Sequence, residues 1–507
     1  MYSTNEKWPV SDTEPSSDQD VLARLGYKEE FKRNFSHLEL FGISFTIVGV
    51  VQSIAAVLLY SIPYGGPVGM IWGWLCCSVF LVCVAMALAE LGSAAPTAGG
   101  LYYWTFKYSS PRYRKLLSWL IGYLNTTGYV AGVASFDWGC ASQLFAAVNI
   151  SSGGAFQATT AQTYGLFCAI IIAQAIMSCF ATKLLARLQW GYVALNLALF
   201  LVVIIVLPVK TPRNLVNEPS YAFGHFENLS GWPNGYAFFM SFLAPAWTLA
   251  GFDVSVHISE EAKNAQRAVP FAIMCSTSLG IVLGWVVNIV LAFHIGDDLQ
   301  SVVNNPIGQP MATIFVNSVG PTGAVAFWAF IVVTLFISGQ DVLTVASRQT
   351  FAFSRDQGFP ISKFLYRMNV QTQTPIYAVL FCATLAMLLG LIAFAGPLAI
   401  SAIFTMSIAC LYICIATPII VRFAGGTQFV PGPFNLGKMS GPVSFVASAY
   451  LTFMIIVFLF PSSPGPTSHS MNYGIVVTAG VLLLSLGYYW TPKYGGRCWF
   501  KGPIHTV

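Results

Sequence analysis

The feature of this sequence that most constrains its fold is a succession of twelve apolar stretches, each of about 18 residues or more. A helix needs about 20 apolar residues to cross a bilayer, and it satisfies its own backbone hydrogen bonds there. The stretches lie at residues 40–60, 68–91, 116–148, 163–182, 190–207, 236–257, 272–295, 323–347, 376–394, 398–421, 443–460 and 473–490. The third exceeds one bilayer thickness, so we expect it to be long and tilted. The sequence therefore predicts an all-α integral membrane protein with twelve transmembrane helices.

Composition supports the membrane class and excludes others. Charged residues make up only 8% of the chain, against about 25% in soluble domains, and apolar residues make up 56%. No basic run is interleaved with aromatic residues, so nucleic acid is not an expected partner. The eleven cysteines lie almost entirely within apolar stretches and form no CxxC pair. We therefore expect them to be packing residues and expect neither a disulfide framework nor a metal site.

The distribution of basic residues predicts the orientation in the membrane. With twelve spans and a cytoplasmic amino terminus, 22 of the 24 Lys and Arg residues fall in cytoplasmic segments, and only Lys210 and Arg213 fall outside. Such an excess is typical of cytoplasmic loops. We therefore expect residues 1–38 and 493–507 to be cytoplasmic tails. Residues 1–18 are predicted to be disordered, and residues 19–36 are predicted to form a short amphipathic helix on the membrane surface. No cleavable signal segment is expected.

Two of the apolar stretches contain residues that interrupt a helix. Gly49 and Gln52 lie in the first, and Pro245 and Gly251 lie in the sixth. Proline cannot donate a backbone hydrogen bond and glycine adds conformational freedom. Helices broken in mid-membrane free their N–H and C=O groups to bind a ligand, with the positive end of a half-helix facing its anion. The alternative interpretation is a continuous helix that is merely kinked.

Five titratable residues within or beside the spans are candidates for proton coupling or gating. They are Glu90, Asp137, Asp253, His257 and Asp341. A charge at mid-bilayer costs about 2.5–3.5 kcal/mol and is functional by default. The pKa range of histidine suits proton sensing. The alternative interpretation for each is a hydrogen-bonded structural residue that holds neighbouring helices together.

The sequence contains no enzymatic pattern. A P-loop, an HExxH motif and a GxSxG motif are all missing, and the six histidines do not cluster. We therefore expect no enzyme activity, no ATP-driven pump and no cofactor beyond an ion gradient.

Four segments carry a resemblance to a known family. They are residues 49–55 (GVVQSIA), 89–104 (AELGSAAPTAGGLYYW), 245–265 (PAWTLAGFDVSVHISEEAKNA) and 347–360 (SRQTFAFSRDQGFP). On these segments the chain resembles the fungal amino acid/choline permeases of the amino acid–polyamine–organocation superfamily. Residues 132–140 (GVASFDWGC) look like the branch that holds the GABA permeases. The resemblance spans roughly residues 35–502, nearly the whole chain.

The resemblance implies a LeuT-type fold with two inverted repeats of five helices. The transport core would be residues 39–422, with repeats at about 39–208 and 235–422. Two peripheral helices would follow at 423–492. Family members are secondary transporters, commonly driven by protons.

The resemblance also implies where the substrate binds. Its carboxylate would meet the N–H groups of the broken first helix, and its amine would meet the carbonyl groups of the broken sixth helix. The substrate-binding residues implied in this way are Gly49, Val50, Val51, Gln52, Ser53, Trp247, Thr248, Ala250, Gly251, Phe252 and Asp253. The chain departs from some relatives because its fifth stretch carries Asn196 but no lysine to replace a sodium ion.

These observations together predict a proton-coupled importer of a small amino acid or amine, with GABA or a related ω-amino acid favoured. The alternatives are a choline, thiamine or polyamine permease, a passive channel, and a nutrient sensor with the same fold. The expected partners are the small-molecule substrate and the lipid bilayer. The plasma membrane is the favoured location and the vacuolar membrane the alternative.

Overall fold

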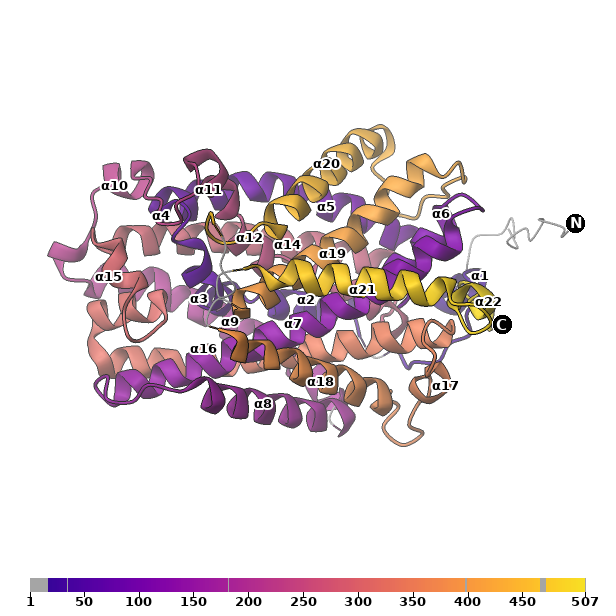
Figure 1. Ribbon diagram of the computed structural model, residues 1–507, viewed down its shortest axis with the longest axis horizontal. Coiled ribbons are helices and arrows are strands. Elements are labelled where there is room, and N and C mark those ends of the chain that lie inside the picture. The colour runs from indigo at the N-terminus through magenta and orange to yellow at the C-terminus, as the bar shows by residue number, and fades with distance from the viewer. Residues whose placement is uncertain (1–16, 34, 181, 397–398, 466–470, 507) are drawn as a thin grey trace, which may run out of the picture.

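The fold is known from a computed structural model that describes residues 17–33, 35–180, 182–396, 399–465 and 471–506, with backbone alone at 182–186 and 399. Within these ranges the regular secondary structure is helical, apart from isolated bridges between Phe35 and Ala262 and between Tyr64 and Asn228. The predicted all-α fold is therefore confirmed. Figure 1 shows the long helices lying roughly along one axis as a bundle.

The helices match the predicted spans closely. The first half contains α2 (His37–Val48), α3 (Val50–Ser61), α4 (Gly66–Val68), the π-helical turn η1 (Gly69–Gly73), α5 (Trp74–Ala94), α7 (Arg114–Ser151), α8 (Thr160–Phe180) and α9 (Thr182–Lys210). The second half contains α11 (Asn234–Met240), α12 (Leu243–Thr248), α13 (Val254–His257), α14 (Ala265–His294), α16 (Pro310–Arg355), α18 (Ile376–Gly390), α19 (Ala399–Ala424), α20 (Ser440–Leu459) and α21 (Tyr473–Trp490). Spans one, two and six are each built from consecutive helical pieces.

Eleven segments in the described part of the chain are long and apolar enough to cross a membrane, and α7 completes the predicted twelve. Helix α7 is less apolar because Asn125, Ser135 and Asp137 lie along it, and all three are buried within the protein rather than facing lipid. It has 38 residues, as the long third stretch predicted. Helix α16 begins earlier than the predicted residue 323 because it continues across a kink at Gly320, where φ is +76°.

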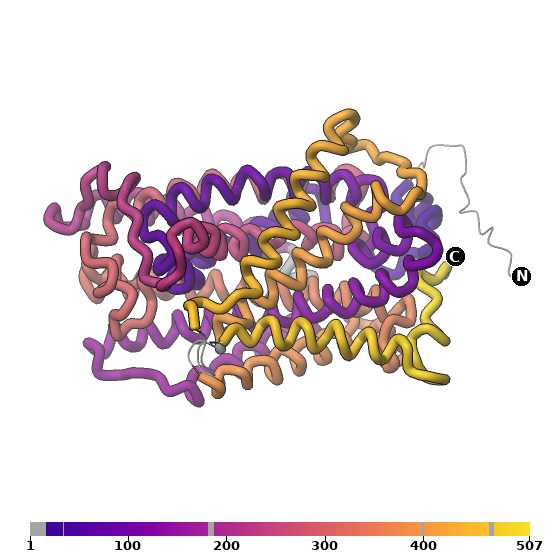
Figure 2. The backbone as a smooth tube through the Cα atoms, turned by 45° about the horizontal axis from the view of Figure 1, so that its top comes forward, coloured from indigo at the N-terminus to yellow at the C-terminus, as the bar shows by residue number. Residues whose placement is uncertain are grey.

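The broken spans occupy the centre of the bundle. The share of buried residues was compared over the most apolar 18 residues of each span. It is 94% in the first span and 78% in the sixth, but only 28% in α9 and 22% in α21. Figure 2 shows α20 and α21, in gold and yellow, running along one side of the bundle. The third helices of the two predicted repeats, α7 and α16, pack along each other more extensively than any other pair. This arrangement places spans one and six where a ligand would be shielded from lipid.

The two ends of the bundle differ in the short helices that cover them. Helices α1 (Asp18–Arg24), α6 (Gly100–Tyr108), α17 (Ser362–Leu365) and α22 (Gly496–Trp499) lie at one end, which we call the terminal end (Figure 1). Helices α10 (Pro219–Gly224) and α15 (Leu299–Val303) lie at the other, the opposite end.

The amino-terminal segment differs from its prediction. The helix expected over residues 19–36 is only α1, which Ser17 caps by accepting a hydrogen bond from the backbone N–H of Asp20. Beyond it Tyr27, Phe31 and Phe35 are buried against the protein rather than lying on a membrane surface. The apolar side chains that suggested an amphipathic helix instead pack on the helix bundle, so that prediction was wrong. Most of the tail predicted to be disordered, residues 1–16, lies outside the described residues.

Candidate functional site

Span one is broken at Gly49, as its sequence predicted. Gly49 separates α2 from α3 and has φ of +38°, in the left-handed region that favours glycine. A Cβ at this position would lie 2.8 Å from the backbone carbonyl oxygen of Thr46, so a larger residue would be strained there. The first hydrogen bond of α3 runs from the N–H of Ser53 to the carbonyl of Gly49. The N–H groups of Val50, Val51 and Gln52 are therefore left without intrahelical acceptors, at the positive end of α3.

Span six is broken after Thr248. Leu249 and Ala250 lie outside the helix, and a single 3₁₀ turn, η3 (Gly251–Asp253), connects to α13. A milder interruption lies at residues 241–242, between α11 and α12, and Pro245 follows it in the first turn of α12, where no N–H is needed. A Cβ at Gly251 would lie 3.4 Å from Cγ2 of Ile47 in α2. The break in span six therefore faces span one, close to Gly49.

Several buried oxygen atoms at these breaks have no hydrogen-bond partner within the described residues. They are Oε1 of Gln52, Oγ of Ser53, Oγ1 of Thr248 and Oδ1 of Asp253. The amide nitrogen of Gln52 is paired and donates to Oδ1 of Asn196 in α9 at 2.7 Å. An unsatisfied buried polar group costs about 1–3 kcal/mol. The breaks are therefore suited to a polar ligand that supplies the missing partners.

An aromatic cluster lies beside the breaks. The indole N–H of Trp247 donates to Oγ of Ser135 at 3.3 Å, and the Trp247 ring lies 4.5 Å from Phe136 and 5.2 Å from Phe404. Phe404 in turn lies 5.2 Å from Tyr60. Sequence reasoning identified Trp247 but missed Ser135, Phe136, Tyr60 and Phe404. The first two stand in the 132–140 segment that resembles the GABA-permease branch, which was the available signal.

A small cavity adjoins this cluster. It has a volume of about 120 Å³, and Tyr60, Leu243 and Thr405 are among its lining residues. Its other lining residues come from the end of span one, from α11 and α19, and from the segment between α20 and α21, among them Pro63, Ser462 and Asn472. The aromatic cluster therefore adjoins both the broken helices and this cavity.

Asp253 and His257 form a buried pair directly after the break in span six. Nδ1 of His257 lies 2.7 Å from the carbonyl oxygen of Ala98, which can only accept, so Nδ1 carries a proton. Nε2 of His257 lies 3.3 Å from Oδ2 of Asp253, and both side chains are almost fully buried. This second hydrogen bond requires one further proton, on the imidazole or on the carboxyl group. The pair is therefore neutral while it shares that proton and carries a net charge of −1 without it.

The other candidate acids have different surroundings. Asp341 accepts hydrogen bonds from Nε2 of Gln189 at 3.1 and 3.2 Å, and Oε1 of Gln189 accepts from Thr46, three residues before the Gly49 break. Asp137 accepts from Nε2 of Gln174 in α8 at 2.7 Å. Asp341 is thus linked to the site through one glutamine, whereas Asp137 connects α7 to α8.

Glu90 lies in a complete set of partners that joins three helices. It accepts from Arg422 at 2.6 Å, from Oγ of Ser440 at 2.6 Å and from the N–H of Leu436 at 3.2 Å. These contacts tie α5 to α19 and to the start of α20.

Three predicted substrate-binding residues are apolar and buried among apolar neighbours: Val50, Val51 and Phe252. The groups that Val50 and Val51 could offer a ligand are therefore their backbone N–H groups.

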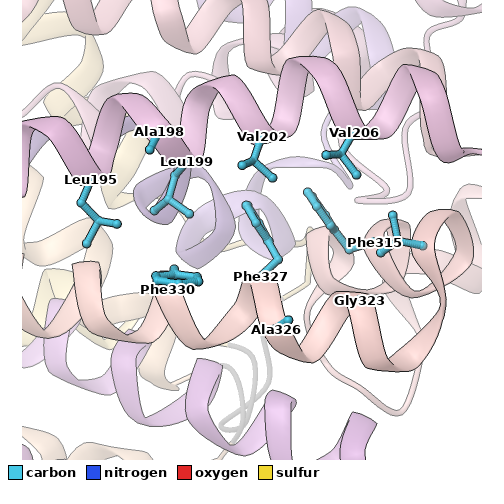
Figure 3. Close-up of a pocket in the computed structure, with 11 residues that line it drawn as sticks. Leu195, Ala198, Leu199, Val202, Val206, Phe315, Gly323, Ala326, Phe327 and Phe330 are labelled. Carbon is cyan, nitrogen blue, oxygen red and sulfur yellow. The ribbon is translucent and has the colours of Figure 1, made fainter.

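A second cavity is a different feature. It has a volume of about 410 Å³ and lies between α9 and α16, with Phe315, Phe327 and Phe330 projecting into it (Figure 3). Every lining side chain is apolar: Leu195, Ala198, Leu199, Val202, Val206, Phe315, Val319, Gly323, Ala326, Phe327 and Phe330. It offers no group that could hold a carboxylate or an ammonium, so it is not the substrate site. The described residues contain no cluster of three or more potential metal ligands.

Comparison with known proteins identifies relatives along almost the entire chain. The sequence profile described as "Amino acid permease" matches residues 35–481. The GABA-specific permease of Saccharomyces cerevisiae is 38% identical over 497 residues, which cover 97% of this chain and 86% of the relative. An uncharacterised amino-acid permease of Schizosaccharomyces pombe is 35% identical, covering 97% and 89%. Amino-acid permease 2 of Neurospora crassa is 34% identical, covering 98% and 91%.

Proposed function

Since the chain belongs to the amino acid permease family, we propose that it imports GABA or a related ω-amino acid, driven by the proton gradient. Membership of the family makes the protein an amino acid transporter of the membrane rather than an enzyme. The substrate, the coupling to protons and the direction are the parts that we propose.

The observation that carries the proposal is the pair of facing breaks with unpartnered polar atoms. The free N–H groups at the start of α3 suit a carboxylate, because a helix amino terminus carries partial positive charge. The carbonyl groups at the end of α12, near Trp247 and Ala250, suit an ammonium group, and Asp253 follows them. Trp247 and Phe136 offer apolar surface for methylene groups between these two ends. A short zwitterion satisfies both ends at once.

The Asp253–His257 pair supports coupling to protons. In its deprotonated form the pair buries a net negative charge, and an uncompensated buried charge costs several kcal/mol. A proton removes that charge, and a zwitterionic substrate adds none. We infer that the site closes around the substrate when the pair holds its proton, so that one proton accompanies each substrate molecule.

The orientation follows from the basic residues. Lys210 and Arg213 lie at the junction of α9 and α10, toward the opposite end, while Lys107, Arg355 and Arg497 lie toward the terminal end. By the positive-inside rule the terminal end faces the cytoplasm. We propose the plasma membrane as the location, with the small cavity beside Tyr60 on the outer side.

The aromatic cluster makes a quaternary amine such as choline the second candidate. Trp247, Phe136, Phe404 and Tyr60 together could surround such a cation through cation–π contacts. Choline has no carboxylate, however, and would leave the N–H groups of α3 without a partner. The amino acid therefore accounts for more of the site.

Uptake of a labelled panel into cells that lack their own permeases tests the proposal. The panel contains GABA, neutral α-amino acids, choline, putrescine and thiamine, each with and without a protonophore. Saturable GABA uptake that the protonophore abolishes is the expected result. Uptake that the protonophore leaves unchanged would contradict proton coupling, and uptake of choline alone would favour the second candidate. No uptake by surface-expressed protein would favour the sensor.

A further inference from the structure

A buried carboxylate at the terminal end gathers hydrogen bonds from three distant segments. Asp356, directly after α16, accepts from the hydroxyl groups of Tyr27 and Tyr102 at 2.7 Å each and from the N–H of Ile504 at 2.9 Å. Burial raises the pKa of Asp356 to about 6, while Arg355 and these hydrogen bonds act to lower it. Hydrogen bonds to an ionised acceptor are among the stronger ones. Asp356 therefore joins the segments before α2, within α6 and after α22.

The neighbouring Arg355 joins span eight to span six. Its guanidinium donates two hydrogen bonds of 2.9 Å to the carboxylate of Glu260, in the turn η4 (Ser259–Glu261) after α13. The ring of Tyr27 lies 3.8 Å from the same guanidinium. Although burial raises the pKa of Glu260, Arg355 and the hydrogen bonds outweigh it and hold that pKa below its usual value. The ends of spans six and eight are thus held together beneath Tyr27.

The two chain-end segments are also bonded to each other. The N–H of Thr506 donates to the carbonyl of Gly26 at 2.7 Å, and Oγ1 of Thr506 accepts from the N–H of Lys28 at 2.9 Å. On the other side, the N–H of Phe35 donates to the carbonyl of Glu261 at 3.0 Å. Residues 26–33, Phe35 and residues 504–506 therefore form one layer, attached to span six through Glu261 and to span eight through Asp356.

Ala98 connects this layer with the candidate proton site. Its carbonyl accepts from Nδ1 of His257 at 2.7 Å, and its N–H donates to Oε1 of Glu260 at 3.0 Å. Glu260 is the partner of Arg355, and Arg355 is covered by Tyr27. Two hydrogen bonds, both made by the backbone of Ala98, therefore link the Asp253–His257 pair to the Glu260–Arg355 ion pair that the layer covers.

We propose that residues 504–506, together with residues 26–33 and Phe35, form a latch that closes the inner end of the transport path. The inward direction rests on the proposed function. A substrate between the two breaks can leave toward the terminal end only if the ends of spans six and eight separate. Residues 26–33, Phe35 and residues 504–506 bridge those ends, so separating the ends must break the attachment of this layer either to Glu261 or to Asp356. The carboxy-terminal segment is then a moving part of the gate.

Hydrogen exchange of the purified full chain, followed by mass spectrometry, tests this latch without any substrate. Ile504→Pro removes the N–H that Asp356 accepts, and Ile504→Ala is the matched control that keeps it. We expect Ile504→Pro to raise exchange about tenfold or more in residues 26–33 and in residues 254–263, with Ile504→Ala near wild type. Faster exchange confined to residues 500–506, or no change in residues 254–263, would overturn the proposal.

A second variant covers the possibility that Ile504→Pro does not fold. Tyr27→Phe keeps the ring against Arg355 and removes the hydroxyl group that Asp356 accepts. It is expected to speed exchange in the same two regions, and unchanged exchange in residues 254–263 would count against the latch. Because neither readout depends on uptake, failure of the substrate panel and failure of the latch are distinguishable.

Discussion

Asp253→Asn separates substrate binding from proton coupling. In the native pair Nδ1 of His257 is committed to Ala98, so the contact between Nε2 and Asp253 needs a proton. An asparagine amide donates its own N–H to Nε2 and forms the same bond without taking up a proton. The variant therefore has the shape and the charge of the protonated pair at every pH. We expect it to fold, to bind substrate and to exchange it across the membrane, but not to accumulate it.

The size of the effect follows from one proton per pair. Moving one charge across about 100 mV is worth about 2.3 kcal/mol, and each tenfold concentration ratio costs about 1.36 kcal/mol, so one proton supports roughly 50-fold accumulation. Proteoliposomes with an imposed potential of about 100 mV, loaded with the substrate that the panel identifies, measure this ratio. Wild type should approach this accumulation ratio. Uptake by Asp253→Asn should stop when the substrate concentrations on the two sides are nearly equal, while exchange of substrate continues.

Two outcomes would refute this reasoning. Accumulation by Asp253→Asn at the wild-type level would remove the pair from the coupling mechanism. Loss of accumulation in Asp137→Asn but not in Asp253→Asn would place the proton on α7 instead. A thermal-unfolding profile of each variant in detergent separates both outcomes from loss of folded protein.

Three further predictions concern other parts of the site and its support. Gly251→Leu should weaken substrate affinity roughly 5- to 150-fold, because overpacking against span one costs about 1–3 kcal/mol. Substrate-induced thermal shifts measure the affinity, and unchanged affinity would show that the substrate does not use this gap. Glu90→Gln should lower the free energy of unfolding by roughly 3–5 kcal/mol by stranding Arg422, whereas an unaltered melting temperature would contradict a structural role. Glu260 has a lowered pKa, so its stabilisation is present above the ordinary value of 4.5 and is lost as the pH falls through the folded-state pKa. Thermal unfolding from about pH 7 to about pH 4 should show this acid loss in wild type and less of it in Glu260→Gln.

The candidate site was predicted in part from single residues. Gly49 was identified because glycine readily adopts a left-handed conformation, and φ at this residue is +38°. In span six the sequence marked the right region, but the main break follows Thr248 rather than Pro245. Pro245 is the third residue of α12, where an N–H has no intrahelical acceptor in any case, so proline is tolerated there.

What the sequence by itself determined is the membrane architecture: the twelve spans, their order and the family. These follow from local apolar length and from motifs, and neither depends on which segments meet in space. Only the tertiary structure decided which partner each buried titratable group meets. Glu90 meets Arg422, Asp356 meets Tyr27 and Ile504, and His257 meets Ala98, all across large separations in sequence. In a low-dielectric interior the nearest hydrogen-bond partner decides whether a carboxylate is a structural link, a gate or a proton site, and no local pattern encodes that partner.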